Sequence, residues 1–354
     1  MKNYALLLIV ILSCAGQSTS SPEENADYIN NGKEVTCFVY HRFGDSRYPT
    51  TNVPVSDFEA HLKWLQKNGY RMITFSEAIA YLKSDEPIQK TAVITVDDAY
   101  KSFFKNGLPL LKKYNYPSTL FINTETVGGG DYMDWASLEA AMKSKVEIGN
   151  HTHTHNYFLN EDAATRYKTF EDEIKLSQTI IEKNLNITPV VFSYPYGEFD
   201  LPMKEIAKKL GFQAAAAQNS GVLYSGGDLF MCPRFPMSES YSAINKFIEK
   251  ASSGPLKVLK ASPESFMSPP DKRPLLTLDI DNTDLVLKRI QCFVQGGECD
   301  LRVLETKDNK TTLTVQAIKP MTSKRRTLYT VTIPDKKGRW HWYSHLWINE
   351  KKKE

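Results

Sequence analysis

Apolar and polar residues follow two different patterns along this chain of 354 residues. Between about residues 35 and 250, short runs rich in β-branched residues alternate with stretches whose apolar residues recur every three or four positions. The first pattern is typical of buried strands and the second of amphipathic helices. Their alternation predicts repeated β-α units and a mostly parallel sheet.

The boundaries of these elements follow from turn and cap signals. Ser56 with Glu59 forms a capping-box pattern at the start of the first helix, and Asp134 is placed to cap a later one. Helices are expected at 56–68, around Pro109, and at 135–142, 163–183 and 202–210. Strands are expected at 36–40, 71–74, 92–96, 119–122, 146–149, 190–193, 212–217 and 234–237.

The pattern changes after residue 251. The segment 252–274 contains Ser252-Ser253-Gly254 and five prolines, which predicts a linker or an extended connection. From 275 to 354 the chain reads as strands joined by polar turns, so we expect a small β-sandwich there. Its strands should cover 275–279, 284–294, 300–305, 311–318, 327–333 and 340–348.

The last of these strands is unusually aromatic. It contains Trp340, Trp342 and Trp347 within eight residues of one another. One interpretation is a glycan-binding surface, and the other is burial in the sandwich core or against the first domain, because at least one face of any strand must be covered.

The N-terminus carries an apolar run that differs from all others in the chain. Lys2 precedes the run 4–12, and small and polar residues follow through Ser21. Such a run is too short to span a bilayer comfortably and predicts a secretory signal over residues 1–21, so the rest of the chain should be exported. Cys14 lies in a context similar to a bacterial lipoprotein processing site, so a lipid anchor and simple cleavage both remain open.

Export makes the remaining four cysteines informative, because disulfides persist outside the cytosol. Cys292 and Cys299 flank a Gly-Gly turn, which predicts a local hairpin bridge. For Cys37 and Cys232, a bridge and two buried thiols are both open.

Composition adds exclusions. Apolar residues make up 41% and charged residues 24% of the chain, which is ordinary for a globular protein. The formal net charge of +3 argues against a dedicated nucleic-acid binder, because such domains concentrate basic residues on one face.

Three polar clusters follow directly after predicted strands, at the edge where parallel α/β folds place their active sites. The first is Asp97-Asp98, the second contains His151 and His155, and the third runs from Tyr194 to Gly197. Two histidines four residues apart can face one ion, and a carboxylate completes a set that leaves coordination positions open. We therefore expect a catalytic metal site, with His153 pointing elsewhere.

These clusters resemble motifs of the polysaccharide deacetylases with a NodB homology domain. The segment 95–100 (TVDDAY) is similar to the first motif of that family, and 149–155 (GNHTHTH) to the second. The segment 192–197 (FSYPYG) resembles the third motif, except that Ser193 stands where the family has arginine. The resemblance covers about residues 35–250 and implies a distorted (β/α) barrel over 22–251, followed by the β-sandwich.

The resemblance also implies roles for the motif residues. Asp97 would be the general base, Asp98 with His151 and His155 would bind a divalent metal, and the backbone beside Pro195-Tyr196 would form an oxyanion site. Zn²⁺ suits such ligands, although Co²⁺, Ni²⁺ or Fe²⁺ would also be accepted.

Two further roles rest on a subgroup that acts on poly-β-1,6-N-acetylglucosamine. The element Tyr40-His41-Arg42 resembles that subgroup, which makes His41 the candidate general acid, with a buried structural histidine as the alternative. Arg234 is the candidate partner for Asp97 in place of the missing arginine. Trp135 and Tyr194 are candidates for stacking on sugars, with core packing as the alternative.

The function expected from these features is metal-dependent removal of N-acetyl groups from a β-linked N-acetylglucosamine polysaccharide in the bacterial envelope, by a periplasmic, secreted or lipid-anchored enzyme. The exopolysaccharide is the first choice of substrate and peptidoglycan the second. A noncatalytic glycan-binding protein on the same scaffold is a rival from another class. A glycosidase that uses two carboxylates is less favoured, because it leaves the histidines without a task.

Overall fold

The computed structural model describes residues 32–267, 273–321 and 324–352. The predicted signal segment and Cys14 lie outside these residues. Within the described part of the chain, the helices are all too short or too polar to cross a lipid bilayer.

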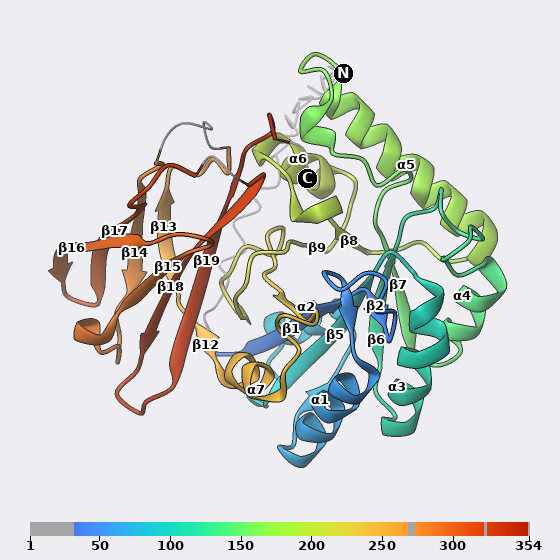
Figure 1. The fold of residues 1–354 in the computed structure, drawn as a ribbon, viewed down its shortest axis with the longest axis horizontal. Helices are drawn as coiled ribbons and strands as arrows, with labels where there is room; N and C mark the ends of the chain where they lie inside the picture. Colours follow the sequence, from blue (N-terminus) through green and yellow to red (C-terminus); the bar gives the residue numbers. More distant parts are fainter. Residues whose placement is uncertain (1–31, 268–272, 322–323, 353–354) are drawn as a thin grey trace, which may run out of the picture.

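A curled, mainly parallel sheet forms the first domain (Figure 1). Its order is β10-β1-β5-β6-β7-β8-β9, in which β10 pairs antiparallel with β1, while β11 and β4 pair in parallel with β1 and β5. Its strands are β1 (Glu34–Tyr40), β4 (Arg71–Met72), β5 (Thr91–Asp97), β6 (Ser118–Ile122), β7 (Val146–Asn150), β8 (Val191–Ser193), β9 (Ala214–Ala216), β10 (Leu223–Tyr224) and β11 (Phe235–Pro236). A separate ribbon joins β2 (Arg42–Phe43) to β3 (Asn52–Val53).

The helices alternate with these strands, as the sequence predicts. They are α1 (Val55–Lys67), α2 (Phe75–Lys83), α3 (Leu108–Tyr114), α4 (Trp135–Met142), α5 (Arg166–Leu185), α6 (Leu201–Lys209) and α7 (Ile244–Ser252), with a π-helical turn, Phe103–Gly107, before α3. The predicted cap of α4 is confirmed, because the Asp134 carboxylate accepts a hydrogen bond from the Ser137 N–H.

The predicted capping box of α1 is wrong. The helix begins after Pro54, so Ser56 lies inside it, and no side chain caps its first turn. A complete capping box instead starts α2, where Thr74 and Glu77 bond reciprocally. That helix was missed in the sequence, as was α7.

Strand alternation decides which side chains face the barrel interior. Along β5, Ala92, Ile94 and Val96 pack in the same core cluster as the apolar faces of α1, α3 and α4. Val93 lies in a second cluster, in the barrel interior, with residues of α2. Because successive side chains of a strand point to opposite faces, Thr95 and Asp97 face the interior as Val93 does.

The second domain is a sandwich of two four-stranded sheets, as predicted. One has the order β12-β19-β18-β15 and the other β13-β14-β17-β16, with a shared apolar core between them. The strands are β12 (Gly254–Pro255), β13 (Val258–Ser262), β14 (Leu276–Asp281), β15 (Gln291–Val294), β16 (Cys299–Lys307), β17 (Lys310–Ala317), β18 (Arg326–Pro334) and β19 (Trp340–Ile348).

Two expectations for this region need correction. The described part of 252–274 supplies β12 and β13 to the sandwich and is therefore more than a linker. The strand expected to start at residue 284 starts at Gln291, after a 3-10 turn over Leu287–Arg289.

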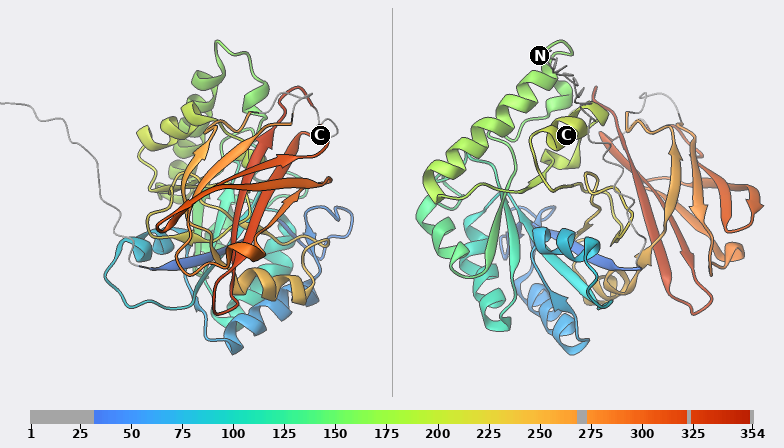
Figure 2. Two further views of the ribbon diagram at one scale, coloured as in Figure 1. Left: turned by 90° about the vertical axis from the view of Figure 1, so that its left-hand side faces the viewer. Right: turned by 180° about the vertical axis from the view of Figure 1, so that it is seen from behind.

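The sandwich packs directly against the barrel along β19 (Figures 1 and 2). Leu346 and Ile348 belong to the apolar cluster that contains residues of α5 and α6. The Trp342 ring meets the Phe235 ring edge-on at 5.5 Å. Trp347 is buried in the sandwich core, so for this side chain the burial interpretation of the aromatic strand is confirmed.

The cysteines divide into one bridge and two thiols. Cys292 and Cys299 form the predicted disulfide. Cys37 and Cys232 are both buried and free, so the alternative of a bridge between them is wrong. Burial raises the pKa of the Cys37 thiol to about 12.

Candidate active site and metal centre

Asp97 and Arg234 form a buried ion pair at the carboxyl end of β5. The Arg234 guanidinium donates to both Asp97 oxygens, at 2.8 and 2.9 Å, and both side chains are fully buried. Burial by itself would raise the pKa of Asp97, but the charge of Arg234, followed by His151, lowers it to about 2. Asp97 is therefore a carboxylate held in one orientation, in the pairing that the sequence suggested.

The serine in the third motif has a clear structural counterpart. Ser193 ends β8 and faces the interior, where its hydroxyl accepts a hydrogen bond from Arg234 at 3.0 Å. Arg234 also donates to the Thr95 hydroxyl and to the Ala217 carbonyl. The arginine thus reaches Asp97 from just before β11, and the small side chain of Ser193 leaves it room.

Asp98, His151 and His155 bring three ligand atoms together. The two Nε2 atoms are 3.1 Å apart, and Asp98 Oδ1 lies 3.6 Å from that of His151 and 3.5 Å from that of His155. All three atoms lie within 4.8 Å of one another. Asp98 Oδ1 is buried and has no hydrogen-bond partner among the described residues. A buried carboxylate oxygen without a partner is costly unless a cation completes it, so these residues fit a metal ion.

The orientation of His151 supports the same conclusion. Its Nδ1–H donates to the Ser193 carbonyl at 2.7 Å, which leaves Nε2 as an acceptor among the ligand atoms of Asp98 and His155. A hydrogen bond from the other ring nitrogen to a carbonyl fixes the tautomer of metal-ligating histidines. Burial lowers the pKa of His151 and of His155 to about 4, so both rings are neutral, as ligands must be.

Backbone strain is concentrated around these residues. Asp98 and Ala99 have φ values of 72° and 55°, and Thr152 and His155 have 68° and 56°. Residues other than glycine adopt this left-handed region at a cost and are often found at functional sites. The two tight turns carry residues whose ligand atoms meet, because Asp98 Oδ1 and His155 Nε2 are 3.5 Å apart.

His41 follows β1, which pairs with β5 so that Tyr40 lies opposite Val96. His41 therefore comes one residue further, level with Asp97. A positive charge on His41 lowers the pKa of both Asp97 and His155. His41 is partly exposed, which does not match the alternative of a buried structural histidine.

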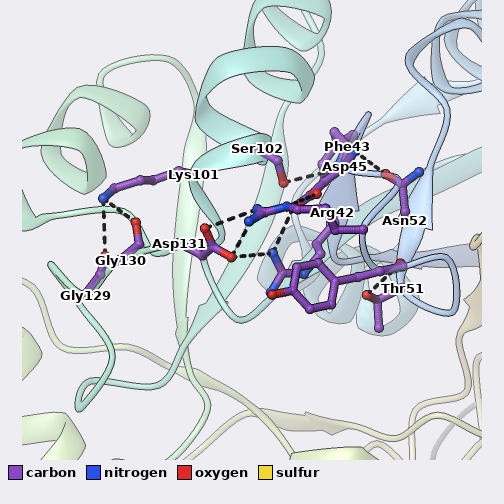
Figure 3. A network of polar contacts seen from close by, with 12 residues as sticks. Arg42, Phe43, Asp45, Thr51, Asn52, Lys101, Ser102, Gly129, Gly130 and Asp131 are labelled. Carbon is purple, nitrogen blue, oxygen red and sulfur yellow. Dashed lines mark hydrogen bonds and ion pairs between the residues drawn. The ribbon is translucent and has the colours of Figure 1, made fainter.

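Arg42, the residue after His41, anchors the loop that carries both residues through a network of polar contacts (Figure 3). No sequence pattern indicated this network. The Arg42 guanidinium lies between the rings of Tyr48 and Tyr100, 3.8 and 3.5 Å from their centroids. It also pairs with Asp45 at 3.0 Å and with Asp131 at 3.4 Å. Since Tyr100 follows Asp97-Asp98 closely, the network ties the His41 loop to the loop after β5.

The Pro195-Tyr196 loop borders the histidines. Pro195–Gly197 forms a short 3-10 turn in which Tyr196 has a φ of 59°. The Tyr196 ring lies 4.4 Å from the His155 ring and stacks on Tyr157 at 3.8 Å. The Tyr196 carbonyl accepts a hydrogen bond from Arg326 at 3.3 Å. A sandwich residue therefore reaches the candidate site, which no sequence pattern indicated.

For Tyr194, one of the two stacking candidates, the alternative of core packing is confirmed. Tyr194 is fully buried in the cluster under α5 and α6, stacks on Phe199 and donates its hydroxyl hydrogen to the Phe230 carbonyl. It cannot stack on a sugar, because strand alternation turns it to the helix-covered face when Ser193 faces the interior. Trp135 is the first residue of α4 and packs partly buried against the main core.

Comparison with known proteins agrees with the geometry. Residues 84–215 match the family model described as polysaccharide deacetylase. The Bacillus subtilis protein YxkH, whose polysaccharide deacetylase name is provisional, is 26% identical over 240 residues, which are 66% of this chain and 84% of that protein. A poly-β-1,6-N-acetyl-D-glucosamine N-deacetylase of Staphylococcus aureus is 25% identical over 224 residues, which are 60% of this chain and 75% of that protein.

Solved structures share the fold of the first domain. The Streptococcus pyogenes deacetylase PplD, determined in complex with acetate, aligns with a TM-score of 0.55 at 21% identity, covering 60% of this chain and 96% of that one. IcaB from Ammonifex degensii aligns with a TM-score of 0.52 at 22% identity, covering 61% and 96%. The matched motifs, the curled sheet and the Asp-His-His cluster agree with one another, and they identify the first domain of this chain as a polysaccharide deacetylase domain.

Proposed function

We propose that this protein is a metal-dependent N-deacetylase that removes acetyl groups from a β-linked N-acetylglucosamine polysaccharide, with poly-β-1,6-N-acetylglucosamine as its substrate. The observation that carries the activity is the convergence of Asp98, His151 and His155 on one point beside the ion pair of Asp97. The choice of polymer is supported by the S. aureus relative and by His41 at the end of β1.

The residues divide the work of amide hydrolysis. A divalent cation held by Asp98, His151 and His155 would polarise the acetyl carbonyl and acidify the attacking water. Asp97 would accept the proton of that water, and Arg234 would hold the carboxylate in line for it. His41, in its protonated form, would donate to the sugar nitrogen as the C–N bond breaks. Backbone N–H groups beside Tyr196 would stabilise the oxyanion.

The donor set also bears on the metal and on the location of the protein. Two imidazoles and a carboxylate suit Zn²⁺, which is our first choice, and also accept Co²⁺, Ni²⁺ or Fe²⁺. Elemental analysis of protein purified without added metal decides among them. We also propose that the protein is exported, on the strength of its N-terminal apolar run.

Free-amine release tests the function. Protein starting near Ser21 is incubated, with and without chelator, with β-1,6-glucosamine, chitin and peptidoglycan oligomers that all carry N-acetyl groups. We expect chelator-sensitive release from the β-1,6 oligomer, lost in D97N and kept in D172N, which alters an exposed carboxylate on α5. Amine release from peptidoglycan alone would identify peptidoglycan as the substrate. No release from any glycan, with glycan binding retained, would identify the protein as a noncatalytic glycan-binding protein.

A further inference from the structure

A groove of about 1240 Å³ runs between the barrel and the sheet β12-β19-β18-β15 of the sandwich. Barrel residues from the Tyr196 turn to α7 form one wall, and side chains of β15, β18 and β19 form the other. Sites for single small ligands usually measure about 300–1000 Å³, so this groove has room for more than one sugar unit.

The groove comes close to the candidate active site through Tyr196. Tyr196 lines it, and the ring of this residue lies 4.4 Å from that of His155, one of the candidate metal ligands. Arg326, at the start of β18, also lines the groove and bonds the Tyr196 carbonyl. A polymer whose reacting unit lies beside His155 could therefore continue directly along the sandwich.

The sandwich wall has the chemistry of a sugar-binding surface. Strand alternation turns Tyr329 and Val331 of β18 into the sandwich core, so that Thr330 and Thr332 face the groove. Phe293, opposite Thr330 on β15, is 52% exposed, and Trp340 on β19 also lines the groove. Aromatic faces can cover the apolar C–H faces of sugar rings. The two threonines are largely buried, and the Thr330 hydroxyl already bonds that of Ser344 at 2.9 Å, so the aromatic side chains are the main candidates for sugar contacts.

The charged residues that line the groove are mainly basic, which bears on whether it binds acetylated or deacetylated sugar units. Five basic residues line the groove, and the acidic residue among its described lining residues is Glu249; the basic ones are Lys246, Lys250, Lys324, Arg325 and Arg326. Glu198 pairs with both arginines, so the three lysines provide most of the positive charge. Lys246 and Lys250 lie over the Tyr241 ring, 5.7 and 4.8 Å from its centroid. N-acetylglucosamine units are neutral, whereas deacetylated units carry an ammonium group that these cations repel.

We propose that the groove between barrel and sandwich binds neighbouring units of the same polysaccharide chain in their neutral, N-acetylated form, and excludes units that are already deacetylated. The proposal rests on the proposed function and adds to it a role for the second domain: the sandwich extends the substrate site and directs the enzyme to acetylated stretches.

The first test compares oligomers of increasing length. For the wild-type protein, kcat/KM on fully acetylated β-1,6 oligomers should rise about tenfold or more from two to six units. Removal of two aromatic contacts in F293A/W340A should raise KM for the hexamer about tenfold and leave values for the dimer unchanged. L304A, which truncates an exposed leucine on the opposite sheet, is the matched control and should behave as wild type. Thermal unfolding verifies that each variant is folded.

The second test measures binding without turnover. Tryptophan fluorescence of chelator-treated protein, which should not turn over the substrate, is titrated with the acetylated hexamer and with the fully deacetylated glucosamine hexamer at low salt. The acetylated hexamer should bind at least tenfold more tightly, and K246Q/K324Q should reduce that ratio by relieving the repulsion of the amines. K168Q, on the far helix α5, serves as the matched control.

The two proposals fail in different ways. Amine release that is independent of chain length, or equal binding of the two hexamers, would overturn the groove proposal and leave the deacetylase intact. If no glycan releases amine, the proposed function fails, and selective binding of the acetylated hexamer would then still support the groove.

Discussion

Two buried arginine–carboxylate pairs lie in different regions of this molecule. Arg234 pairs with Asp97 inside the barrel, and Arg325 pairs with Glu198 where the sandwich meets the barrel. Each arginine donates to both oxygens of its partner, at 2.6–2.9 Å, and each pair is excluded from water. By geometry and burial alone, the two pairs are nearly equivalent.

The two ion pairs differ in the residues that surround them. Asp97 lies next to Asp98, whose buried Oδ1 has no partner among the described residues, and close to two neutral histidines. Arg325, in contrast, also donates to the Asn160 side chain and to the carbonyls of Glu350 and Lys352. The pair of Arg234 and Asp97 orients a carboxylate beside side chains that fit a cation. Arg325, with Glu198, holds loops of the two domains together. A buried ion pair therefore indicates chemistry only when its neighbours are left unsatisfied.

The largest effect on activity should come from a change of Asp98, whose buried Oδ1 has no partner among the described residues. D98N removes the charged ligand but keeps the shape of the side chain. Deacetylation should fall by roughly 10²–10³-fold or more, because the chain then holds the cation poorly. Chelation of the wild type should mimic the variant, and the bound metal should drop in elemental analysis. The unfolding free energy of the metal-free protein should change by less than about 1 kcal/mol, since Oδ1 has no bond to lose. Full activity in D98N would remove the metal centre from the mechanism.

Breaking the pair inside the barrel should affect both activity and stability. R234M leaves Asp97 buried without a counter-charge, which should cost about 3–5 kcal/mol of unfolding free energy. Activity should be lost as well, because the carboxylate then protonates or turns. In R234M/D97N, where no charge is left behind, denaturant titration should recover a large part of the stability without recovering activity. An active R234M would show that Arg234 does not position Asp97.

Breaking the pair of Arg325 and Glu198 at the domain contact should lower stability but have little effect on activity. R325M leaves Glu198 buried with Arg326, at 3.5 Å, as its remaining counter-charge, so we expect a loss of up to about 3–5 kcal/mol in chemical unfolding. Amine release from a short oligomer at a temperature where the protein is folded should fall less than about tenfold, because Arg325 touches no reacting group. An activity loss as severe as that of R234M would contradict the distinction between the two regions.

A smaller, pH-dependent effect should also arise at the domain contact. His345 on β19 is 3% exposed, stacks on Phe266 at 5.3 Å, and burial lowers its pKa to about 4. Since the unfolded chain takes up this proton near pH 6.5, the folded state loses stability as pH falls from about 6.5 to 4, by up to about 3 kcal/mol.

Other buried histidines in the barrel contribute to the total, so the comparison needs H345F, which does not titrate. Urea unfolding at pH 7 and pH 4.5 should show a smaller decrease for H345F than for the wild type. An equal decrease would mean that His345 is not held neutral by the contact.

Local patterns in the sequence predicted most of the strands and helices. They also predicted the cluster of Asp98, His151 and His155, because each motif follows directly after a buried strand. The pairing of Arg234 with Asp97 was also anticipated, from the absence of an arginine at Ser193. Features that depend on distant packing were not found: Tyr194 could be placed only once Ser193 was known to face the interior. Arg325 and Arg326 reach the site loops from the second domain, about which the motifs say nothing.

The position of Arg234 has a consequence for how the protein folds. Arg234 and Asp97 are 137 residues apart in the sequence, so the chain between them must be closed into a loop before the pair can form. Contacts between distant residues slow folding, because the entropy of loop closure is lost before the contact rewards it. On the ribosome, Asp97 emerges well before its partner is synthesised, and it stays hydrated until the last barrel strands arrive. Burial of this carboxylate should therefore be among the late events of folding, and the site is completed only when the barrel closes.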